Sequence, residues 1–363
     1  MTKPVIYPIV KPVLPNIACY NRYIEQIFER NWLTNAGPMV QALEQKLAEY
    51  LGVEHLLLVA NGTLALEVAY AALGITGKVI TTPFTFAASA SSLCWQGIKP
   101  QFTDIHPTSL NFCPTQLPSK LDSDVSALLA VHVFGNPCEV ELLEQYTKQH
   151  NIAMIYDAAH AFGSQFKNRS LLSYGDAATL SLHATKLFHS IEGGAIVFKT
   201  AEHKAKAKQI INFGFDTNNI PSLVGINAKM SEMHAAMGLC LFDMADDIIS
   251  HRQALVAAYQ QQLHNIVLFQ QWHNEGKNNG AYMPVLFESE QQLLQVMQAL
   301  AKQGTQTRRY FYPSLANIGI YANQQAMPVT DNIAARILCL PMYYDLTIAD
   351  VSVICQQIKS ALL

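Results

Sequence analysis

The sequence predicts an α/β fold: a mostly parallel central sheet covered by helices, followed by a smaller C-terminal α/β domain. Two observations predict this fold. Short apolar runs, typical of buried strands, alternate with helical segments from residue 55 to about residue 240. Beyond that point long, Gln-rich helical stretches surround short strand candidates. We therefore expect an N-terminal arm (1–15), a large domain (16–240) and a small domain (241–363).

The N-terminal part is expected to form the arm and then two helices. Four prolines within the first fifteen residues favour an extended arm. Apolar residues such as Ile24, Ile27 and Phe28 then recur at helical spacing. The segment NWLTNAGP (31–38) interrupts this pattern and predicts a loop, after which the helical pattern resumes and ends near Gly52.

Strand–helix units make up the large domain. Because strands in such a sheet are buried on both faces, ligands bind at their carboxyl ends. The predicted strands lie within HLLLVA (55–60), KVITTP (78–83), PQFTDI (100–105), ALLAVHVFG (127–135), IAMIYDAAHAFG (152–163), GDAATLSLHATK (175–186) and AIVF (195–198). In the small domain we expect helices within 245–264 and 288–304 and strands within 281–287 and 335–343.

The composition limits the partners of the chain. Half of the 363 residues are apolar and only 14% are charged, so part of the surface is expected to be covered in a homo-oligomer. A net charge of −3 without a large basic patch disfavours nucleic-acid binding. The apolar stretches are interrupted within the length of a membrane span, which disfavours membrane insertion. The seven scattered cysteines predict reduced thiols in the cytoplasm and no metal site.

One lysine lies within the mostly apolar segment SLHATKLFHSIEGGAIVF (181–198). Lys186 is either a surface lysine with a buried stem or a reactive amine. An enclosed, apolar site disfavours the ammonium form. The neutral amine can then attack a carbonyl or hold a Schiff base.

Asp157 ends the apolar run IAMIY and so places a carboxylate at the tip of a buried strand. It is either a helix N-cap or the partner of a cationic ring nitrogen. His160 follows one helical turn later and is either an ordinary half-buried histidine or part of the same site. A lysine, an aspartate about thirty residues upstream and nearby hydroxyls are the groups that pyridoxal 5'-phosphate (PLP) requires.

A phosphate site is predicted separately in ANGTLAL (60–66), which follows a strand and opens a helix. Gly62 allows close backbone approach, and Thr63 offers a hydroxyl and an N–H at the helix N-terminus. The alternative is an ordinary Asn-Gly turn. Phe86, in TTPFTF (81–86), is either a core aromatic or a ring that stacks on a flat ligand.

The chain contains an ordered set of motifs: NGTLAL, TTPFTFAAS, YDAAHAFGS, GDAATLSLHATKLF, EGGAIV and GINAKMSEMHAAMGL. This set resembles the DegT/DnrJ/EryC1/StrS family of nucleotide-sugar aminotransferases, which are fold type I PLP enzymes. The resemblance runs from about residue 20 to the C-terminus. It implies a fold type I PLP-dependent aminotransferase in which Lys186 forms the internal aldimine and moves the proton.

The resemblance also implies roles for other residues. Asp157 corresponds to the partner of the pyridine nitrogen, and His160 lies near the ring hydroxyl. Phe86 covers the ring, and the phosphate ligands are Gly62, Thr63 and Ser181. Asn227 corresponds to an asparagine that reaches the phosphate of the neighbouring subunit's cofactor, so the resemblance implies a homodimer with shared active sites.

The segments NWLTNAGPMVQALEQKLAEYLGV (31–53) and TRRYFYPSL (307–315) are most similar to one subgroup of this family. That subgroup transfers the amino group of L-glutamate to the C4 ketone of dTDP-4-dehydro-6-deoxyglucose, giving dTDP-4-amino-4,6-dideoxyglucose for surface polysaccharide (O-antigen). The resemblance then places Thr34, Asn35 and Gly37 at the sugar. Arg308 and Arg309 are candidates for the nucleotide diphosphate, with surface solvation as the alternative. His183 has a structural or substrate-side role.

Other functions stay open at this stage. Relatives that aminate C3 or act on GDP-sugars differ in few contacts. Family members with histidine in place of the lysine carry out a dehydration, and the presence of Lys186 argues against that activity. A non-catalytic regulatory protein of the same fold and a different fold type I enzyme are the remaining alternatives.

Overall fold

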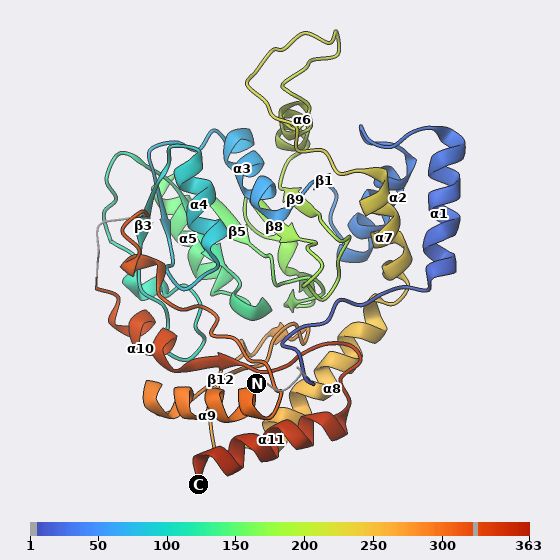
Figure 1. Ribbon diagram of the computed structural model, residues 1–363. Helices are drawn as coiled ribbons and strands as arrows, with labels where there is room; N and C mark the ends of the chain where they lie inside the picture. Colours follow the sequence, from blue (N-terminus) through green and yellow to red (C-terminus); the bar gives the residue numbers. More distant parts are fainter. Residues whose placement is uncertain (1–5, 322–325) are drawn as a thin grey trace.

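A seven-stranded sheet forms the centre of the computed structural model, which describes residues 6–321 and 326–363 (Figure 1). Its strand order is β1-β9-β8-β5-β4-β2-β3. β9 pairs antiparallel with both neighbours, whereas the other pairs are parallel, so the prediction of a mostly parallel sheet is confirmed. The strands are β1 (Leu56–Val59), β2 (Lys78–Thr81), β3 (Lys99–Phe102), β4 (Val125–Val131), β5 (Ala153–Asp157), β8 (Ala177–Ser181) and β9 (Gly194–Phe198).

Helices cover both faces of this sheet. Leu56 and Leu58 of β1 pack into one apolar cluster, and Leu57 and Val59 pack into another, because successive strand residues point to opposite faces. α2, α5 and α7 contribute to the first cluster, and α3 and α6 contribute to the second. The helices of this part are α1 (Ile17–Arg30), α2 (Pro38–Leu51), α3 (Gly62–Leu73), α4 (Ala87–Trp95), α5 (Val140–His150), α6 (Ala201–Ile210) and α7 (Glu232–Phe242).

The predicted break between the first two helices is confirmed. Asn31 caps the C-terminus of α1, Gly52 caps that of α2, and both residues adopt left-handed backbone conformations. The buried Glu232 carboxylate accepts hydrogen bonds from the amides of Met39 (2.9 Å) and Val40 (3.0 Å). It thereby caps the N-terminus of α2, where backbone amides lack partners within the helix.

One predicted strand is shorter than expected. The apolar run 127–135 predicts a strand, but β4 ends at Val131. The Asn111 side chain accepts a hydrogen bond from the amide of Val133 and donates to the carbonyls of Asn136 and Pro137. These side-chain contacts satisfy the backbone in place of a strand partner, and the chain turns at Phe134 with φ 59°.

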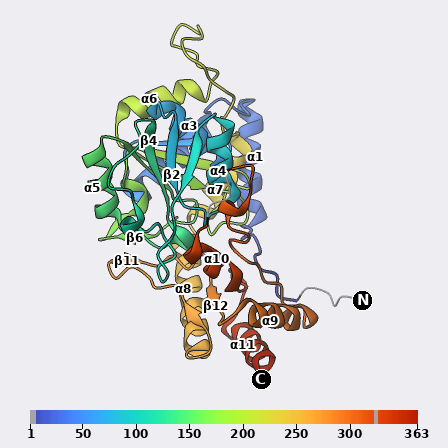
Figure 2. The same cartoon turned by 90° about the vertical axis from the view of Figure 1, so that its left-hand side faces the viewer.

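The C-terminal part forms a second apolar layer beneath the large sheet (Figure 2). Its sheet, in the order β10-β12-β13, is antiparallel, and α9 and α11 contribute to its apolar cluster. The strands predicted within 281–287 and 335–343 are therefore confirmed. The elements are α8 (Ala245–Leu263), β10 (Leu268–Phe269), β12 (Pro284–Leu286), α9 (Glu290–Lys302), α10 (Pro328–Arg336), β13 (Ile337–Cys339) and α11 (Ile348–Leu362). A boundary at residue 240 stays a prediction.

The N-terminal arm contacts both the C-terminal part and the large domain. Residues 1–5 lie outside the described chain, and residues 6–15 form no helix. The carbonyl of Ile9 accepts from the amide of Met342 (3.1 Å), and the carbonyl of Val13 contacts Nε2 of His189 (2.8 Å). No helix within the described ranges is long and apolar enough to cross a membrane.

A short three-stranded sheet completes the fold. Its strands β6 (Gln165–Phe166) and β7 (Arg169–Ser170) form a hairpin after β5, and β11 (Gly276–Lys277) pairs with β6. The C-terminal part, through β11, therefore pairs with a strand of the large domain that follows β5.

Candidate active site

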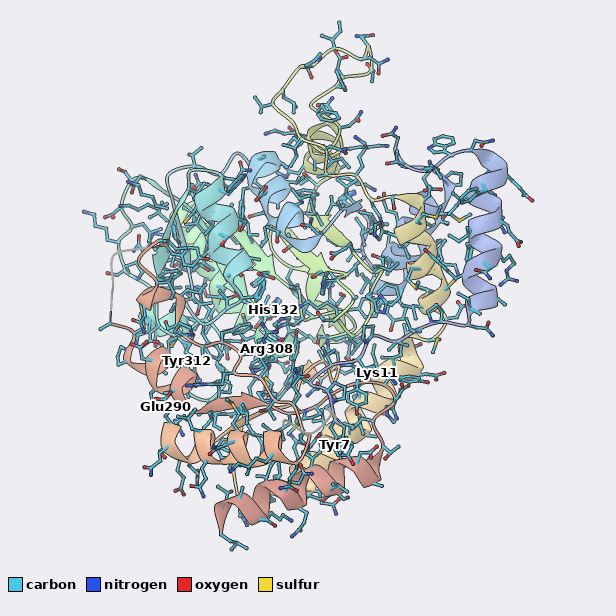
Figure 3. The ribbon with its side chains drawn as sticks, viewed as in Figure 1. Tyr7, Lys11, His132, Glu290, Arg308 and Tyr312 are labelled. Atoms are coloured by element: carbon cyan, nitrogen blue, oxygen red, sulfur yellow. The ribbon has the colours of Figure 1, made fainter. Side chains whose placement is uncertain are left out.

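A cavity of about 920 Å³ lies at the carboxyl ends of β5 and β8. Figure 3 shows one of its lining residues, Arg308, in the region between the central sheet and the C-terminal helices. The position agrees with the rule that open parallel sheets bind ligands at this edge. Nine of the predicted site residues line the cavity: Gly62, Thr63, Phe86, Asp157, His160, Ser181, His183, Lys186 and Arg308.

Asp157 is the last residue of β5 and is buried. Its carboxylate accepts hydrogen bonds from the Ser89 hydroxyl (2.7 Å) and from the Ala159 amide (3.1 Å). Burial raises the pKa of the Asp157 carboxyl, and the two hydrogen bonds and the charge of Lys186 oppose that rise. The group can therefore act as a carboxylate that faces a cation within the cavity.

Lys186 lies in the loop between β8 and β9, and backbone hydrogen bonds join the two sides of this loop. The amide of Leu182 donates to the carbonyl of Gly193 (2.8 Å), and the amide of Ala184 donates to the carbonyl of Ile191 (2.7 Å). Burial lowers the pKa of the Lys186 amine, while the charges of Asp157 and Tyr310 raise it. Burial therefore favours the neutral amine, which is the nucleophilic form.

His160 is held in a neutral form. Burial and the nearby charge of Lys186 keep the pKa of its imidazole well below the usual range. Its Nδ1 accepts a hydrogen bond from the amide of Phe134 (3.2 Å), so the proton is assigned to Nε2. Nε2–H can then donate to an oxygen atom in the cavity.

The N-terminus of α3 and the end of β8 form a cradle for an anion. The Asn61 side chain accepts from the amide of Leu64 (2.9 Å), which leaves the amides of Gly62 and Thr63 without a partner within the helix. A Cβ on Gly62 would lie 3.0 Å from Cβ of Ser181, so the two segments are in close contact. The two amides and the hydroxyls of Thr63 and Ser181 suit a phosphate group.

These groups fit PLP. The cavity combines an amine of lowered pKa, a buried carboxylate, a cradle for phosphate and an exposed aromatic ring, Phe86, on its wall. PLP needs a lysine for its aldehyde, a carboxylate for its ring nitrogen and donors for its phosphate. Each requirement has a matching residue in this one cavity.

Two predicted site residues are engaged elsewhere. The guanidinium of Arg309 donates to Glu290 (2.7 Å) and to the carbonyl of Ala335 (2.9 Å). Glu290 is the first residue of α9, and Figure 3 shows it away from Arg308. Arg309 therefore does not line the cavity. Asn227 is exposed and pairs through its backbone with Asn212, outside the cavity of its own subunit.

The three residues predicted at the sugar lie between α1 and α2, outside this cavity. Thr34 and Asn35 are exposed. Gly37 is buried, and a Cβ at this position would lie 2.7 Å from the carboxyl carbon of Glu232. The close approach of Glu232, which caps α2, explains why glycine occupies position 37.

Sequence reasoning missed two residues of the site. Ser89 reaches Asp157 from the first turn of α4. A serine three residues after the TTPFTF motif is a signal that could have identified it. Tyr282 accepts a hydrogen bond from Nζ of Lys186 (3.3 Å). It lies in an apolar segment before β12, and no local motif marks it.

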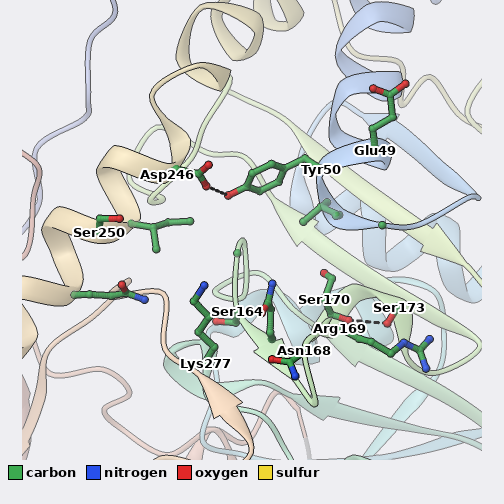
Figure 4. Close-up of a pocket in the computed structure, with 16 residues that line it drawn as sticks. Glu49, Tyr50, Ser164, Asn168, Arg169, Ser170, Ser173, Asp246, Ser250 and Lys277 are labelled. Carbon is green, nitrogen blue, oxygen red and sulfur yellow. Dashed lines mark hydrogen bonds between the residues drawn. The ribbon is translucent and has the colours of Figure 1, made fainter.

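A second cavity of about 540 Å³ lies between α2, the β6–β7 hairpin and α8 (Figure 4). The Tyr50 hydroxyl donates to Asp246 (2.6 Å) across this cavity, and Lys277 also lines it. None of the predicted site residues lines it. We therefore assign the active site to the cavity that contains Lys186.

Comparison with known proteins agrees with this assignment. The model of the DegT/DnrJ/EryC1/StrS aminotransferase family matches residues 18–359. The chain is 39% identical over 355 residues to a dTDP-4-amino-4,6-dideoxy-D-glucose transaminase of Shigella dysenteriae, with 96% of each sequence covered. It is 36% identical over 350 residues to an Escherichia coli transaminase of the same name, with 93% of this chain and 94% of the relative covered.

A solved structure shows the same fold. The crystal structure of DesI in the presence of its TDP-sugar product superimposes with a TM-score of 0.93 and 33% identity, covering 100% of this chain and 94% of the other. The predicted class, a fold type I PLP-dependent aminotransferase, is confirmed, so the chain is an aminotransferase. It belongs to the DegT/DnrJ/EryC1/StrS aminotransferase family.

Removal of the Ser89 hydroxyl should change the pH dependence of the enzyme. The hydrogen bond from Ser89 lowers the pKa of Asp157, so Ser89→Ala raises it. If catalysis needs the ionised carboxylate, the acidic limb of kcat/KM moves to higher pH by about one unit. Ser91→Ala is the matched control, because the Ser91 hydroxyl contacts Tyr321 instead. An unchanged acidic limb in Ser89→Ala would contradict this role.

Proposed function

We propose that this enzyme transfers the amino group of L-glutamate to the C4 ketone of dTDP-4-dehydro-6-deoxy-D-glucose. The product would be dTDP-4-amino-4,6-dideoxy-D-glucose, a precursor for surface polysaccharide such as O-antigen. The observation that carries the proposal is that Lys186 and Asp157 line the same cavity. Similarity over nearly the whole chain to two transaminases of that name supports the choice of sugar.

The residues of the cavity have complementary roles toward PLP. When bound, PLP withdraws electrons from the substrate carbon and so weakens its C–H bond. Lys186 would attach covalently to its aldehyde, and Asp157 would pair with the pyridine nitrogen. Phe86 would cover the ring, and His160 would donate toward the ring hydroxyl. The amides and hydroxyls of the cradle formed by Gly62, Thr63 and Ser181 hold the phosphate.

Lys186 also moves the proton. A buried, neutral amine can take a proton from the carbon that carries the amino group and later deliver a proton in the reverse sense. Burial lowers the pKa of this amine and so increases the share of its neutral form, which can accept a proton. Arg308 supplies a cation at the same cavity, where it suits an anionic group of a substrate.

The active form is proposed to be a homodimer with shared sites. Asn227 follows a segment that projects from the body of the subunit between α6 and α7 (Figure 1). Phe213, Ile220 and Val224 in this segment are exposed. Apolar side chains in a projecting segment suit contact with a second subunit. Thr34 and Asn35 line no part of the Lys186 cavity, so a substrate role for them would also require a second subunit.

The enzyme is proposed to work in the cytoplasm. All seven cysteines are free, and five of them are buried: Cys113, Cys138, Cys240, Cys339 and Cys355. Reduced, buried thiols are typical of proteins in a reducing compartment.

The substrate assignment predicts the outcome of a panel assay. With PLP and L-glutamate, the protein should aminate dTDP-4-dehydro-6-deoxyglucose at least about tenfold faster than GDP-linked or C3-keto sugars, because the nucleotide and the ketone must fit one cavity. Mass detection of the amino sugar is the measurement. A preference for a GDP- or C3-keto sugar would contradict the assignment.

Lys186→Ala serves as the control in this assay. The variant should lose at least about a thousandfold in turnover, because no other residue replaces the covalent amine. The matched variant Lys206→Ala, at an exposed position of α6, should keep the turnover of the wild type. Turnover by Lys186→Ala at a comparable rate would exclude the proposed mechanism.

A shared active site predicts complementation between two inactive variants. Lys186→Ala lacks the reactive amine. Asn227→Asp would place a negative charge beside the phosphate of the PLP bound in the partner subunit. A mixed dimer would regain one site that combines Lys186 of one subunit with Asn227 of the other. Random mixing should therefore restore about a quarter of the wild-type activity, since half of the dimers carry one intact site. Activity of the mixture equal to the mean of the two separate variants would show that Asn227 does not act across subunits.

A further inference from the structure

The Lys186 amine has a single hydrogen-bond partner within the described ranges. Its Nζ donates to the hydroxyl of Tyr282 at 3.3 Å, across 96 positions of sequence. Tyr282 lines the cavity and comes from the segment that leads into β12. None of the roles proposed above involves Tyr282.

The segment that carries Tyr282 is fastened to the loop that follows Asp157. The buried amide side chain of Asn279 donates to the carbonyls of His160 (2.8 Å) and Phe162 (2.9 Å). It also accepts a hydrogen bond from the amide of Ala281 (3.0 Å). These contacts fix the distance between the backbone of Tyr282 and the carboxyl end of β5.

The ring of Tyr282 is confined by other rings. Its centroid lies 4.5 Å from that of His160, 5.3 Å from that of Phe134 and 5.7 Å from that of Tyr310. The Tyr310 ring meets it edge-on, at an interplanar angle of 87°. Such contacts restrict the ring to one orientation, so the position of the hydroxyl is determined before any ligand enters.

We propose that Tyr282 is a positioning residue that holds the Lys186 amine in line for proton transfer. This inference rests on the proposed function, because it takes Lys186 to be the reacting amine. A phenol hydroxyl suits the task, since it can accept from an ammonium group and donate to a neutral amine. It can therefore hold Lys186 in both protonation states that the reaction visits.

The charged and titratable groups nearby keep Tyr282 in its phenol form. Burial raises the pKa of Tyr282 well above its usual range, Cys339 adds to the rise, and Arg252 and Arg308 oppose it. The groups that face Lys186 are Asp157, Tyr310 and His160. Of these groups, Asp157, His160, Arg308 and Tyr310 line the same cavity as Tyr282. At neutral pH the Tyr282 phenol keeps its proton.

The variant Tyr282→Phe tests this role without substrate. It removes only the hydroxyl, so the ring packing stays. In the protein without cofactor, the rate at which trinitrobenzenesulfonate labels Lys186 can be followed against pH by peptide mass spectrometry. The midpoint should fall by about 0.5 to 1 pH unit, because a hydrogen bond to the ammonium form is stronger than one to the neutral amine.

The loaded enzyme provides a second readout. Tyr282→Phe should lower kcat about 10- to 100-fold and leave KM for both substrates within about threefold, since misplacement of the amine affects chemistry more than binding. Tyr146→Phe is the matched control. It removes a hydroxyl that donates to the carbonyl of Pro118, outside the cavity, and should change neither quantity.

Unchanged labelling of Lys186 together with unchanged kcat in Tyr282→Phe would overturn the inference. A change in KM or in thermal stability alone would also overturn it, because either would indicate a merely structural role. If the variant does not fold, 3-fluorotyrosine at position 282 keeps the ring and the hydroxyl but weakens the acceptor. The labelling midpoint should again fall, and an unchanged midpoint would refute the proposal. Failure of the wild type on every sugar would refute the proposed function and leave the labelling result intact.

Discussion

The burial of Lys186 and Asp157 in one cavity is the constraint on which the rest of the site depends. Burial disfavours the charged form of both groups, whereas the attraction between their opposite charges favours it. The parallel register of β5 and β8 pairs Asp157 with Thr179, so the carboxylate and the loop that carries Lys186 leave neighbouring strands. Sheet register therefore sets which two groups meet.

The anion cradle beside Lys186 and Asp157 depends on close approach between backbone segments. A Cβ on Gly194 would lie 2.5 Å from the carbonyl oxygen of Asn61, so β9 can approach the start of α3 only without a side chain. Gly62, the first residue of α3, in turn lies against Ser181, where a Cβ would lie 3.3 Å from the Ser181 hydroxyl oxygen. The C-terminal layer completes the cavity wall with Tyr282, Arg308 and Tyr310. A ligand in this cavity is therefore enclosed by groups from both layers.

The sequence predicted the parts of the site that local patterns mark. Asp157 and Ser181 end buried strands, and the Asn-Gly turn before α3 marks the cradle. Each of these signals involves a strand or helix end and a few neighbouring residues. Residues of this kind could be predicted without knowledge of the tertiary structure.

Other features depend on contacts between distant segments and could not be predicted in this way. Ser89 meets Asp157 across 68 positions, and Tyr282 belongs to the other layer. Arg309 carries a local pattern that suggests phosphate binding, yet its partners are Glu290 and the end of α10. β9 runs antiparallel to β8, and the loop that joins them contains no helix, whereas a parallel connection usually contains a crossover helix. An apolar run such as AIVF carries no information on strand direction.

The covalent link between the cofactor and position 186 can be measured directly. Reduction of the PLP-loaded protein with borohydride, followed by proteolysis and mass spectrometry, identifies the lysine that carries the cofactor. The account predicts one modified site per chain, on the peptide that contains Lys186. A modified lysine elsewhere, or an enzyme that transaminates with Lys186 unmodified after reduction, would contradict it.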